Sequence, residues 1–523
     1  MFTFEIPSID YLQLAPLIVV FLGGCVGVGI ETFARRGKRA GIQVPFTAFV
    51  LILALVFTIV NWAAGNLGIG AVRAIALDGP THFIWTMLLV LTLFSLLIFA
   101  ERRLGGGSTA FTPQAASVPG TPAEADAIKA KLEHTEIYPL LLFALTGMML
   151  FPAANDLITM FVALEVLSLP LYLMAGMARR RRLLSQEAAV KYFLLGALSS
   201  AFFLMGAAFL YGYSGSLELG GISRAVTAQQ GSEALLFGAM GLLAIGLLFK
   251  VGAVPFHSWT PDVYQGAPTP VTAFMAACTK IAAVGALLRV FYVALGGRVW
   301  DWQPLMAVIA VLTMIIGTIF AITQTDIKRL LAYSSVAHAG FLLTAVVGAA
   351  QAETGVGTGQ LTSVGAVMFY LAAYGVATVG AFAIVTMVRN SGGEVTSIDG
   401  WAGLGRKSPG MAAAFALFLL SFAGIPLTSG FIGKWAVFAA AWNGGYGWLV
   451  VVAVLVSLVA AYIYLRLILV MFFSAPADDD IEVVTPSWMT SSVVAVGCII
   501  TVLLGILPGP LLDVATMAGE FLR

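Results

Sequence analysis

The chain has 523 residues, of which 60% are apolar and 10% are charged, and its formal net charge is +1. A soluble domain carries about 25% charged residues, and the mean hydropathy of this chain is +0.97. This composition excludes a soluble enzyme and a disordered protein, and the lack of a basic excess excludes a nucleic-acid-binding protein. Because a membrane-spanning helix needs roughly 20 apolar residues, the sequence predicts an all-α polytopic membrane protein.

Apolar runs separated by turn residues or charges predict about fourteen transmembrane helices. The runs lie near residues 12–31, 45–63, 83–100, 138–153, 157–177, 188–212, 234–258, 269–295, 303–322, 330–350, 363–388, 410–442, 447–473 and 490–512. Residues 101–137 form the longest polar stretch and are rich in Gly, Ser and Pro, so they are predicted to be a flexible loop.

Basic residues are unevenly divided between the two sets of loops. Seventeen lie in loops after odd-numbered spans: Arg35, Arg36, Lys38, Arg39, Arg102, Arg103, Lys129, Lys131, Arg179, Arg180, Arg181, Arg182, Lys328, Arg329, Arg389, Arg406 and Lys407. Four lie on the opposite side: Arg73, Arg224, Arg298 and Arg523. The positive-inside rule then predicts that both termini face away from the cytoplasm.

The acidic run near the C-terminus and the three cysteines do not indicate a metal site. The acidic run at residues 478–480 indicates a solvated loop rather than a metal site. The three cysteines, Cys25, Cys278 and Cys498, lie in separate apolar runs and form neither a disulfide framework nor a metal-binding spacing.

Several charged residues fall inside predicted spans. Glu165 has apolar residues on both sides, and Lys250 and Lys280 lie deep in their spans. A charge at the centre of a bilayer costs roughly 2.5–3.5 kcal/mol on insertion scales, so we expect these residues to face one another or water. Arg289 and Arg466 lie nearer span ends, and we expect their long side chains to snorkel to the membrane interface.

A buried lysine beside a carboxylate can act as a proton switch. Burial favours the neutral amine, whereas a nearby carboxylate favours the charged form. Arginine stays charged and cannot switch in this way. The three mid-span lysines Lys250, Lys280 and Lys434, together with Glu165, therefore indicate proton transfer rather than voltage sensing, which would use a row of arginines.

Two predicted spans are interrupted by proline. Lys250 lies five residues before Pro255, and Lys434 lies eight residues after Pro426. Proline removes an intrahelical hydrogen bond, and the freed carbonyls persist in a membrane only where protein or a hydrated cavity surrounds them. Paired broken helices are typical of inverted repeats with ion sites near the midplane, and two ordinary proline kinks are the alternative.

The breaks divide the chain into four parts. Residues 1–137 are predicted to hold three spans and a cytoplasmic loop, and residues 138–295 a first five-helix repeat of spans 4–8. Residues 296–475 are predicted to hold a second, inverted five-helix repeat of spans 9–13, and residues 476–523 a loop and span 14. Each repeat is broken at its fourth helix.

Three further titratable residues extend the series. His338 lies between the two broken spans, and because imidazole titrates near neutral pH we interpret it as a relay. His257 follows Pro255 and either binds backbone groups freed by the break or carries protons. Lys191, near the start of span 6, either snorkels or lies on the proton path.

Long stretches of the sequence resemble the antiporter-like subunits of respiratory complex I. They include NDLITMFVALEVLSLPLYLMAG, EAAVKYFLLGALSSAFFLMG, LLFKVGAVPFHSWTPDVYQGAPTPVTAFMAACTKIAAVGALLRV, AITQTDIKRLLAYSSVAHAGF and FAGIPLTSGFIGKWAVF. The resemblance covers roughly residues 135–475 closely, and within the family the WTPDVYQGAPTPVTAF and FIGKW stretches are more similar to subunit N than to its paralogues M and L.

The resemblance implies a subunit of NADH:quinone oxidoreductase that forms one proton channel in the bacterial plasma membrane. By motif, the proton-translocating positions of the family fall on Glu165, Lys250, Lys280, His338, Lys434 and, as a further lysine, Lys191. In this family Glu165 would pair with Lys250, and Lys434 would lie near the exit side.

The chain shows no nucleotide or redox motif. We therefore expect no cofactor in this chain, with NADH, FMN, iron–sulfur clusters and quinone bound by other subunits. The expected partners are the lipid bilayer, neighbouring antiporter-like subunits and small membrane subunits. A cation/proton antiporter of the Mrp type, driven by an ion gradient, is the alternative function, and co-purification with flavin and iron–sulfur subunits would discriminate between the two.

Overall fold

The computed structural model describes residues 9–111, 121–129, 133–229, 231–349, 361–476 and 481–522. Three features of the sequence lie outside these residues: Lys131 and Arg523 of the basic count, and the acidic run at residues 478–480.

Among the described residues, twelve helices are long and apolar enough to cross a membrane. Eight of them are simple helices: α1 (Tyr11–Phe33), α2 (Arg36–Ala63), α6 (Leu157–Ala175), α7 (Arg182–Ser214), α14 (Ile327–Val347), α15 (Ser363–Val385), α19 (Gly447–Phe473) and α20 (Trp488–Ile506). Another three are α3 (Gly79–Phe99), α9 (Glu233–Val251) and α13 (Val299–Ile322). The twelfth, Thr269–Ala294, joins α11 (Thr269–Phe274), a π-helical turn (Met275–Thr279), α12 (Lys280–Arg289) and a second π-helical turn (Val290–Ala294).

Two further apolar elements complete the predicted set of about fourteen spans. The helix α5 (Ile137–Ala153) has 17 residues. The other is a broken span made of α17 (Pro409–Ala423) and α18 (Ser429–Asn443). A second broken span is formed by α9 and α10 (Trp259–Gly266). The polytopic helical fold and both predicted breaks are therefore confirmed.

Short elements connect the spans at both ends of the bundle. The helices among them are α4 (Pro122–Lys129), α8 (Leu219–Thr227), α16 (Leu404–Lys407) and α21 (Gly509–Met517). The 3-10 turns are Arg103–Gly105, Gly296–Arg298 and Asp399–Trp401. A two-stranded antiparallel sheet pairs β1 (Gly68–Gly70) with β2 (Ile75–Leu77), and a three-stranded sheet has the order β4 (Gly393–Glu394), β3 (Val388–Asn390) and β5 (Glu482–Val483).

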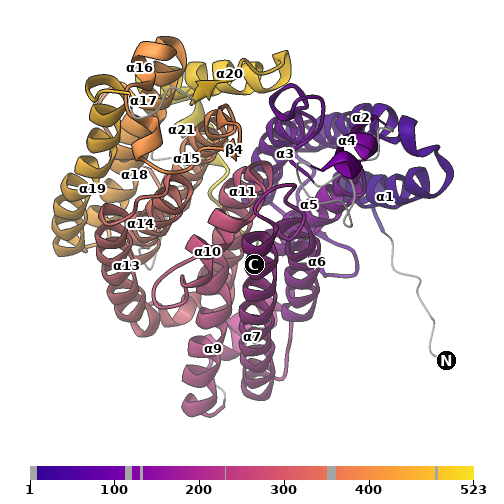
Figure 1. The fold of residues 1–523 in the computed structure, drawn as a ribbon. Helices are drawn as coiled ribbons and strands as arrows, with labels where there is room; N and C mark the ends of the chain where they lie inside the picture. The colour runs from indigo at the N-terminus through magenta and orange to yellow at the C-terminus, as the bar shows by residue number, and fades with distance from the viewer. Residues whose placement is uncertain are drawn as a thin grey trace.

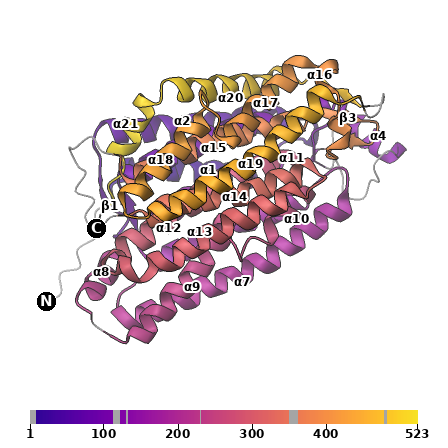
Figure 2. The same ribbon diagram turned by 90° about the vertical axis from the view of Figure 1, so that its left-hand side faces the viewer.

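The long helices run side by side, and the two ends of the bundle differ (Figure 2). One end carries both chain termini together with α8, α21 and β1; we call it the terminal end. The other carries α4, α16 and β3; we call it the basic end, since Arg389 lies in β3 and Arg406 in α16.

The stretch at residues 101–137 is not simply a flexible loop, and that prediction was wrong in part. It contains the helix α4, and its first residue is fixed to the far end of the chain. The Glu101 carboxylate accepts hydrogen bonds from the backbone N–H of Ser487 (2.9 Å) and the hydroxyl of Thr490 (2.9 Å), at the start of α20. The sequence could not show this contact because nearly four hundred residues separate the partners.

Burial rises steeply toward the middle of the bundle, where α14 and α15 lie beside the Thr269–Ala294 span (Figure 1). The most apolar 18-residue stretches of these three spans are 94%, 89% and 100% buried, against 28% for α19 and 22% for α20. Every described charged or polar side chain on the three central helices must therefore find its partner inside the protein.

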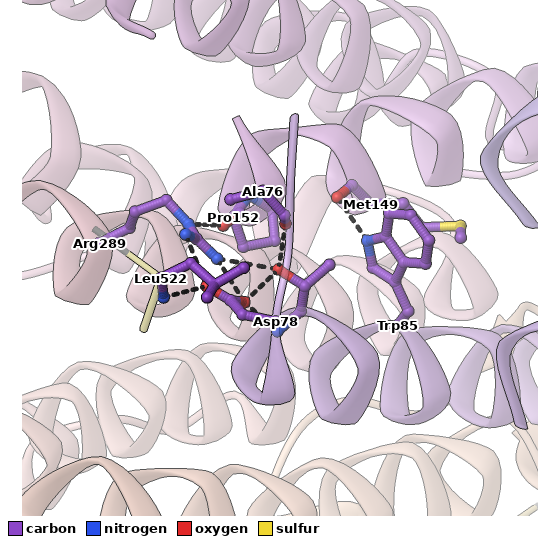
Figure 3. A network of polar contacts seen from close by, with 8 residues as sticks. Ala76, Asp78, Trp85, Met149, Pro152, Arg289 and Leu522 are labelled. Carbon is purple, nitrogen blue, oxygen red and sulfur yellow. Dashed lines mark hydrogen bonds and ion pairs between the residues drawn. The ribbon is translucent and has the colours of Figure 1, made fainter. Parts of the chain in front are cut away.

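Arg289 lies in this buried region and does not snorkel, so its predicted position was wrong. The residue is 0% exposed, and its guanidinium binds both carboxylate oxygens of Asp78, at 2.8 and 2.9 Å (Figure 3). Arg289 also donates to the hydroxyl of Thr81. It donates to the carbonyl of Pro152 as well, and the backbone N–H of Leu522 donates to the Asp78 carboxylate (Figure 3). Removing one member of such a buried pair leaves an uncompensated charge and costs about 3–5 kcal/mol. The network therefore ties α3, α12 and the C-terminal segment together at the terminal end.

Candidate functional site

The first broken helix ends in a glycine cap two residues after Lys250. Gly252 has a φ of +80°, a left-handed conformation that favours glycine. Its N–H donates to the carbonyl of Phe249 (3.1 Å), and the N–H of Ala253 donates to that of Leu248 (2.9 Å), as in a Schellman motif. The indole N–H of Trp259, on α10, also donates to the Phe249 carbonyl (2.9 Å). The freed carbonyls of Leu248 and Phe249 are thus satisfied without the lysine.

Lys250 itself has no hydrogen-bond partner for its ammonium among the described residues, although the side chain is only 2% exposed. The ammonium lies 5.1 Å from the ring centre of Tyr192 and 5.5 Å from that of Tyr172, both distances typical of cation–π contacts. A carboxylate oxygen of Glu165, on α6, is also buried without a hydrogen-bond partner among the described residues. The described residues include no ion pair within 4.0 Å for either group.

Lys280 follows a π-helical turn on the wholly buried span. Its ammonium donates to the carbonyl and to the hydroxyl of Ser335 on α14, the latter at 2.7 Å. It also lies 5.2 Å from the ring centre of Tyr374. Lys250 and Lys280 both line a cavity of about 10 Å³, which is about the space that a single water molecule needs.

His338 lies one helical turn beyond Ser335 on α14 and is 3% exposed. Its Nδ1 is 2.5 Å from the hydroxyl of Tyr370, and its Nε2 is 3.4 Å from the hydroxyl of Tyr464. The Tyr464 hydroxyl also lies 2.5 Å from that of Ser334. Both ring nitrogens therefore face hydroxyl groups that can donate or accept a proton.

The second broken helix ends in the same glycine cap. Gly424 has a φ of +81°, and the N–H groups of Gly424 and Ile425 donate to the carbonyls of Ser421 and Leu420, both at 3.0 Å. A Cβ atom on Gly424 would lie 2.8 Å from Cδ of Lys434, so the absence of a side chain there makes room for the lysine.

Lys434 extends from α18 back across this second break. Its ammonium donates to the freed carbonyl of Ala423 (2.9 Å) and to the hydroxyl of Ser457 (2.8 Å). It also lies 4.8 Å from the ring centre of Phe341 on α14, and the side chain is 5% exposed.

One face of α14 connects these groups. Ser335, His338 and Phe341 follow one another at intervals of three residues, a spacing that places side chains on one helix face. Ser335 contacts Lys280, and Phe341 contacts Lys434. The six residue steps from Ser335 to Phe341 correspond to about 9 Å along the helix. The structure thus brings Lys280, His338 and Lys434 into one continuous buried strip.

Lys191 lies apart from this strip. Its side chain is 42% exposed and pairs with Glu187 (2.6 Å) and Asp262 (2.7 Å), while Asp262 also pairs with Arg329 at 2.7 Å. His257 lies 6.4 Å from the ring of Tyr333, and Trp259 rather than His257 donates to the freed Phe249 carbonyl. Arg466 is exposed and donates to the carbonyl of Ile322 at a helix end, as expected for a residue near the interface.

The hydroxyl groups of the site were not predicted from the sequence; they belong to Ser334, Ser335, Tyr370, Ser457 and Tyr464. A signal was present, because Ser334 and Ser335 precede His338 by one turn of the same helix. The described residues contain no group of three or more His, Cys, Asp or Glu side chains that could hold a metal ion.

Comparisons with known proteins agree with this architecture. A family model described as NADH:quinone oxidoreductase/Mrp antiporter, TM, matches residues 154–460, more than half of the chain. The subunit N of NADH-quinone oxidoreductase from Nocardioides sp. is 57% identical over 99% of both chains, and that of Rhodococcus opacus is 52% identical over 100% of this chain and 98% of the relative. The chain belongs to the NADH-quinone oxidoreductase subunit N family.

Solved structures extend the comparison. A chain of respiratory complex I from Thermus thermophilus is 34% identical, with a TM-score of 0.76 over 97% of this chain and 100% of that chain. A chain of the Mrp complex from Dietzia sp. shares the fold, with a TM-score of 0.79 and 20% identity over 98% of this chain and 97% of that one. As a member of the subunit N family, the chain is an antiporter-like membrane subunit of complex I.

Proposed function

We propose that this subunit carries one proton path through Glu165, Lys250, Lys280, His338 and Lys434. The observation that supports the proposal most directly is the strip on α14, which places a lysine, a histidine and a second lysine within contact of one helix face. All four cationic or imidazole groups are at most 5% exposed, and each can release and regain a proton.

The path begins, in this proposal, at Glu165 and Lys250. The small cavity that Lys250 shares with Lys280 has room for the water molecule that would link them. From Lys280 the proton passes by the Ser335 hydroxyl to His338, and from His338 toward Lys434. Tyr370 and Tyr464 position the imidazole, since their hydroxyls face its two nitrogens. The end near Lys434 serves as the exit side.

The proposed direction of proton movement and the proposed orientation in the membrane rest on the basic residues at the basic end. The concentration of basic residues there supports an orientation with that end in the cytoplasm of a bacterium and both termini outside the plasma membrane. Protons would then move from the cytoplasm to the outer side. The two sets of helices with a glycine-capped break, residues 138–295 and 296–475, would be inverted repeats, flanked by the parts at 1–137 and 476–523.

Electron transfer in other subunits would drive the path, and the neighbouring antiporter-like and small membrane subunits would be the partners. NADH, FMN, iron–sulfur clusters and quinone would be bound by those other subunits, with no cofactor in this chain. A Mrp-type antiporter shares the fold at 20% identity, whereas the subunit N relatives match the whole chain at above 50%. The redox-driven role is therefore the better supported of the two.

The proposal is tested with Lys280→Ala in the intact complex, reconstituted in liposomes. Alanine is a good helix former and removes a costly charge, so assembly should be retained. Because a positioned acid–base group contributes roughly 100-fold or more to proton transfer, conduction through this path should nearly vanish. Lys38→Ala, at an exposed position in the first turn of α2, is the matched control. Pumping at the wild-type rate and proton-to-electron ratio in Lys280→Ala would contradict the proposal.

A further inference from the structure

A cavity of about 90 Å³ opens at the basic end of the bundle, away from the strip on α14. Its walls come from the loop between α3 and α4, the loop between α6 and α7, the turn between α10 and α11, the start of α14 and the β3–β4 hairpin. This space is enough for several water molecules or a small oxyanion. None of the residues proposed for the proton path lines it.

Cationic side chains dominate the described lining of this cavity. Five are basic: Arg179, Arg180, Arg181, Lys328 and Arg389. Two are acidic, and one of these is engaged elsewhere, because the Glu101 carboxylate accepts hydrogen bonds from Ser487, Thr490 and the backbone N–H of Arg103. The other, Glu394, lies 3.7 Å from Arg389 and accepts a hydrogen bond from Thr269. The lining thus keeps a clear positive excess.

Several of these cations are held by neutral oxygens. Arg180 donates to the carbonyl of Ser391 (2.9 Å), and Arg181 donates to the hydroxyl of Thr396 (2.8 Å). Lys328, only 3% exposed, donates to the carbonyl of Ala267 (2.6 Å). Such bonds fix the direction of each side chain but leave its charge in place.

The like charges act on one another. Burial lowers the pKa of the Arg389 guanidinium, and the neighbouring Arg180 and Arg179 lower it further, although Glu394 raises it. Bringing an anion into the cavity would relieve this repulsion, because an opposite charge within about 4–6 Å favours the charged form of each group.

The backbone around the cavity is shaped to bring these cations together. Gly393 has a φ of +123°, and a Cβ atom there would lie 2.9 Å from Cδ of Arg180. Arg181 itself has a φ of +55°, which costs a non-glycine residue about 1–3 kcal/mol and persists only where the surroundings hold it. The hairpin thus leaves room for Arg180 to lie across it, and the strained residue directs its guanidinium at the same hairpin.

We propose that this cavity binds a phosphate group. Guanidinium groups match phosphate oxygens in planar, bidentate geometry, and basic pockets between membrane helices suit lipid headgroups. The group is either the phosphodiester of an anionic phospholipid or free inorganic phosphate. A phosphate bound here would cross-link the N-terminal segment to both sets of five helices, and it would do so independently of proton conduction.

The experiment compares the wild-type complex with the double variant Arg180→Gln/Arg389→Gln. In the lipid arm, intact complex is placed in nanodiscs of phosphatidylcholine that contain a photoreactive phosphatidylglycerol, and labelled peptides are quantified by mass spectrometry. In the phosphate arm, delipidated complex in detergent is equilibrated with radiolabelled inorganic phosphate. The control is Arg35→Gln/Arg406→Gln, which removes two exposed charges from the basic end without touching the cavity.

If the site holds a lipid headgroup, labelling concentrates on residues 176–181 and 387–396 and falls at least about tenfold in the cavity variant, since each charged hydrogen bond contributes roughly a factor of ten. If it holds free phosphate, lipid labelling does not change but one bound phosphate per complex is lost in the cavity variant. In either case the control behaves as wild type. Equal lipid labelling and equal phosphate binding in wild type and cavity variant would overturn the proposal.

A second double variant keeps both positive charges, so that the proposal can still be tested if the first variant does not assemble into the complex. Arg180→Lys/Arg389→Lys keeps both positive charges but loses the bidentate fork, so it should assemble and bind phosphate several-fold more weakly than wild type. Wild-type binding in this variant would show that positive charge alone, and no built site, attracts the anion, and the assigned site would be withdrawn.

Discussion

The two broken helices have the same cap and use their lysines differently. Each first half-helix ends in a Schellman motif with a left-handed glycine, Gly252 in one case and Gly424 in the other. In the first, Lys250 lies before the break and its ammonium faces aromatic rings with no hydrogen-bond partner among the described residues. In the second, Lys434 lies after the break and donates to the freed carbonyl of Ala423.

The two breaks differ in whether the lysine itself donates to a carbonyl freed by the break. At the first break the indole of Trp259 donates to the Phe249 carbonyl, and the Lys250 ammonium has no hydrogen-bond partner among the described residues. At the second break Lys434, which is the titratable group, itself donates a hydrogen bond to the freed carbonyl. We infer that the protonation state of Lys250 is set by an acid, whereas that of Lys434 is set by fixed neutral acceptors.

The largest expected effect comes from alanine substitution at each break. Lys250→Ala and Lys434→Ala should both reduce proton transfer through the path by roughly 100-fold or more, because each removes a titratable group. Only Lys434→Ala also leaves a buried carbonyl without its donor, at a cost of about 1–3 kcal/mol. We therefore expect normal amounts of assembled complex for Lys250→Ala and reduced amounts for Lys434→Ala, measured on native gels beside proton pumping. Equal assembly of the two variants would remove the contrast.

An intermediate effect is expected from Glu165→Gln, which keeps the shape of the side chain and removes its charge. Double-mutant cycles on pumping should give a coupling energy of about 1 kcal/mol or more between Glu165 and Lys250, and less than about 0.5 kcal/mol between Glu165 and Lys434. The physical reason is that Lys434 already donates to the Ala423 carbonyl and the Ser457 hydroxyl, whereas Lys250 and a carboxylate oxygen of Glu165 are buried without hydrogen-bond partners among the described residues. Additivity with Lys250, together with coupling to Lys434, would refute the pairing.

The smallest effect on pumping is expected at Trp259. Trp259→Phe keeps an aromatic ring against Tyr192, whose ring centre is 4.7 Å away, but removes the donor to the Phe249 carbonyl. Thermal stability of the complex should fall, while pumping and its pH profile should stay near wild type. Ser457→Ala is the counterpart at the second break, and because it removes a partner of Lys434 it should shift the pH profile. A shift in Trp259→Phe and none in Ser457→Ala would reverse the assignment.

Much of this arrangement could be predicted from sequence because membrane burial makes charges conspicuous. Lys250, Lys280 and Lys434 stand out in apolar runs, and Pro255 and Pro426 mark the breaks. What could not be predicted was which partner each side chain meets. The Tyr370 and Tyr464 hydroxyls that face His338 come from other helices, and a single sequence has no signal that places them there.

Arg289 shows the same limit more sharply. Its position near a span end fits snorkelling. Its partner Asp78, however, lies 211 residues away, in a stretch that the sequence predicts to be a loop. The sequence left two interpretations of Lys191, which either snorkels or lies on the proton path. Its exposed pairing with Glu187 and Asp262 favours a place outside the buried strip. Long-range pairing, rather than local pattern, decided both positions.

The central claim is that Lys250 works by releasing its proton, and Lys250→Arg tests it most directly. Arginine keeps the positive charge beside Glu165 but does not release its proton in a protein, so charge and titration are separated in one substitution. The measurement is the number of protons translocated per electron by the intact complex in liposomes. We predict that the variant assembles at wild-type levels and pumps poorly, whether NADH oxidation falls with pumping or continues with fewer protons moved. A variant that pumped at the wild-type rate and proton-to-electron ratio would show that Lys250 supports the structure by its charge, and the proton-switch account would be contradicted.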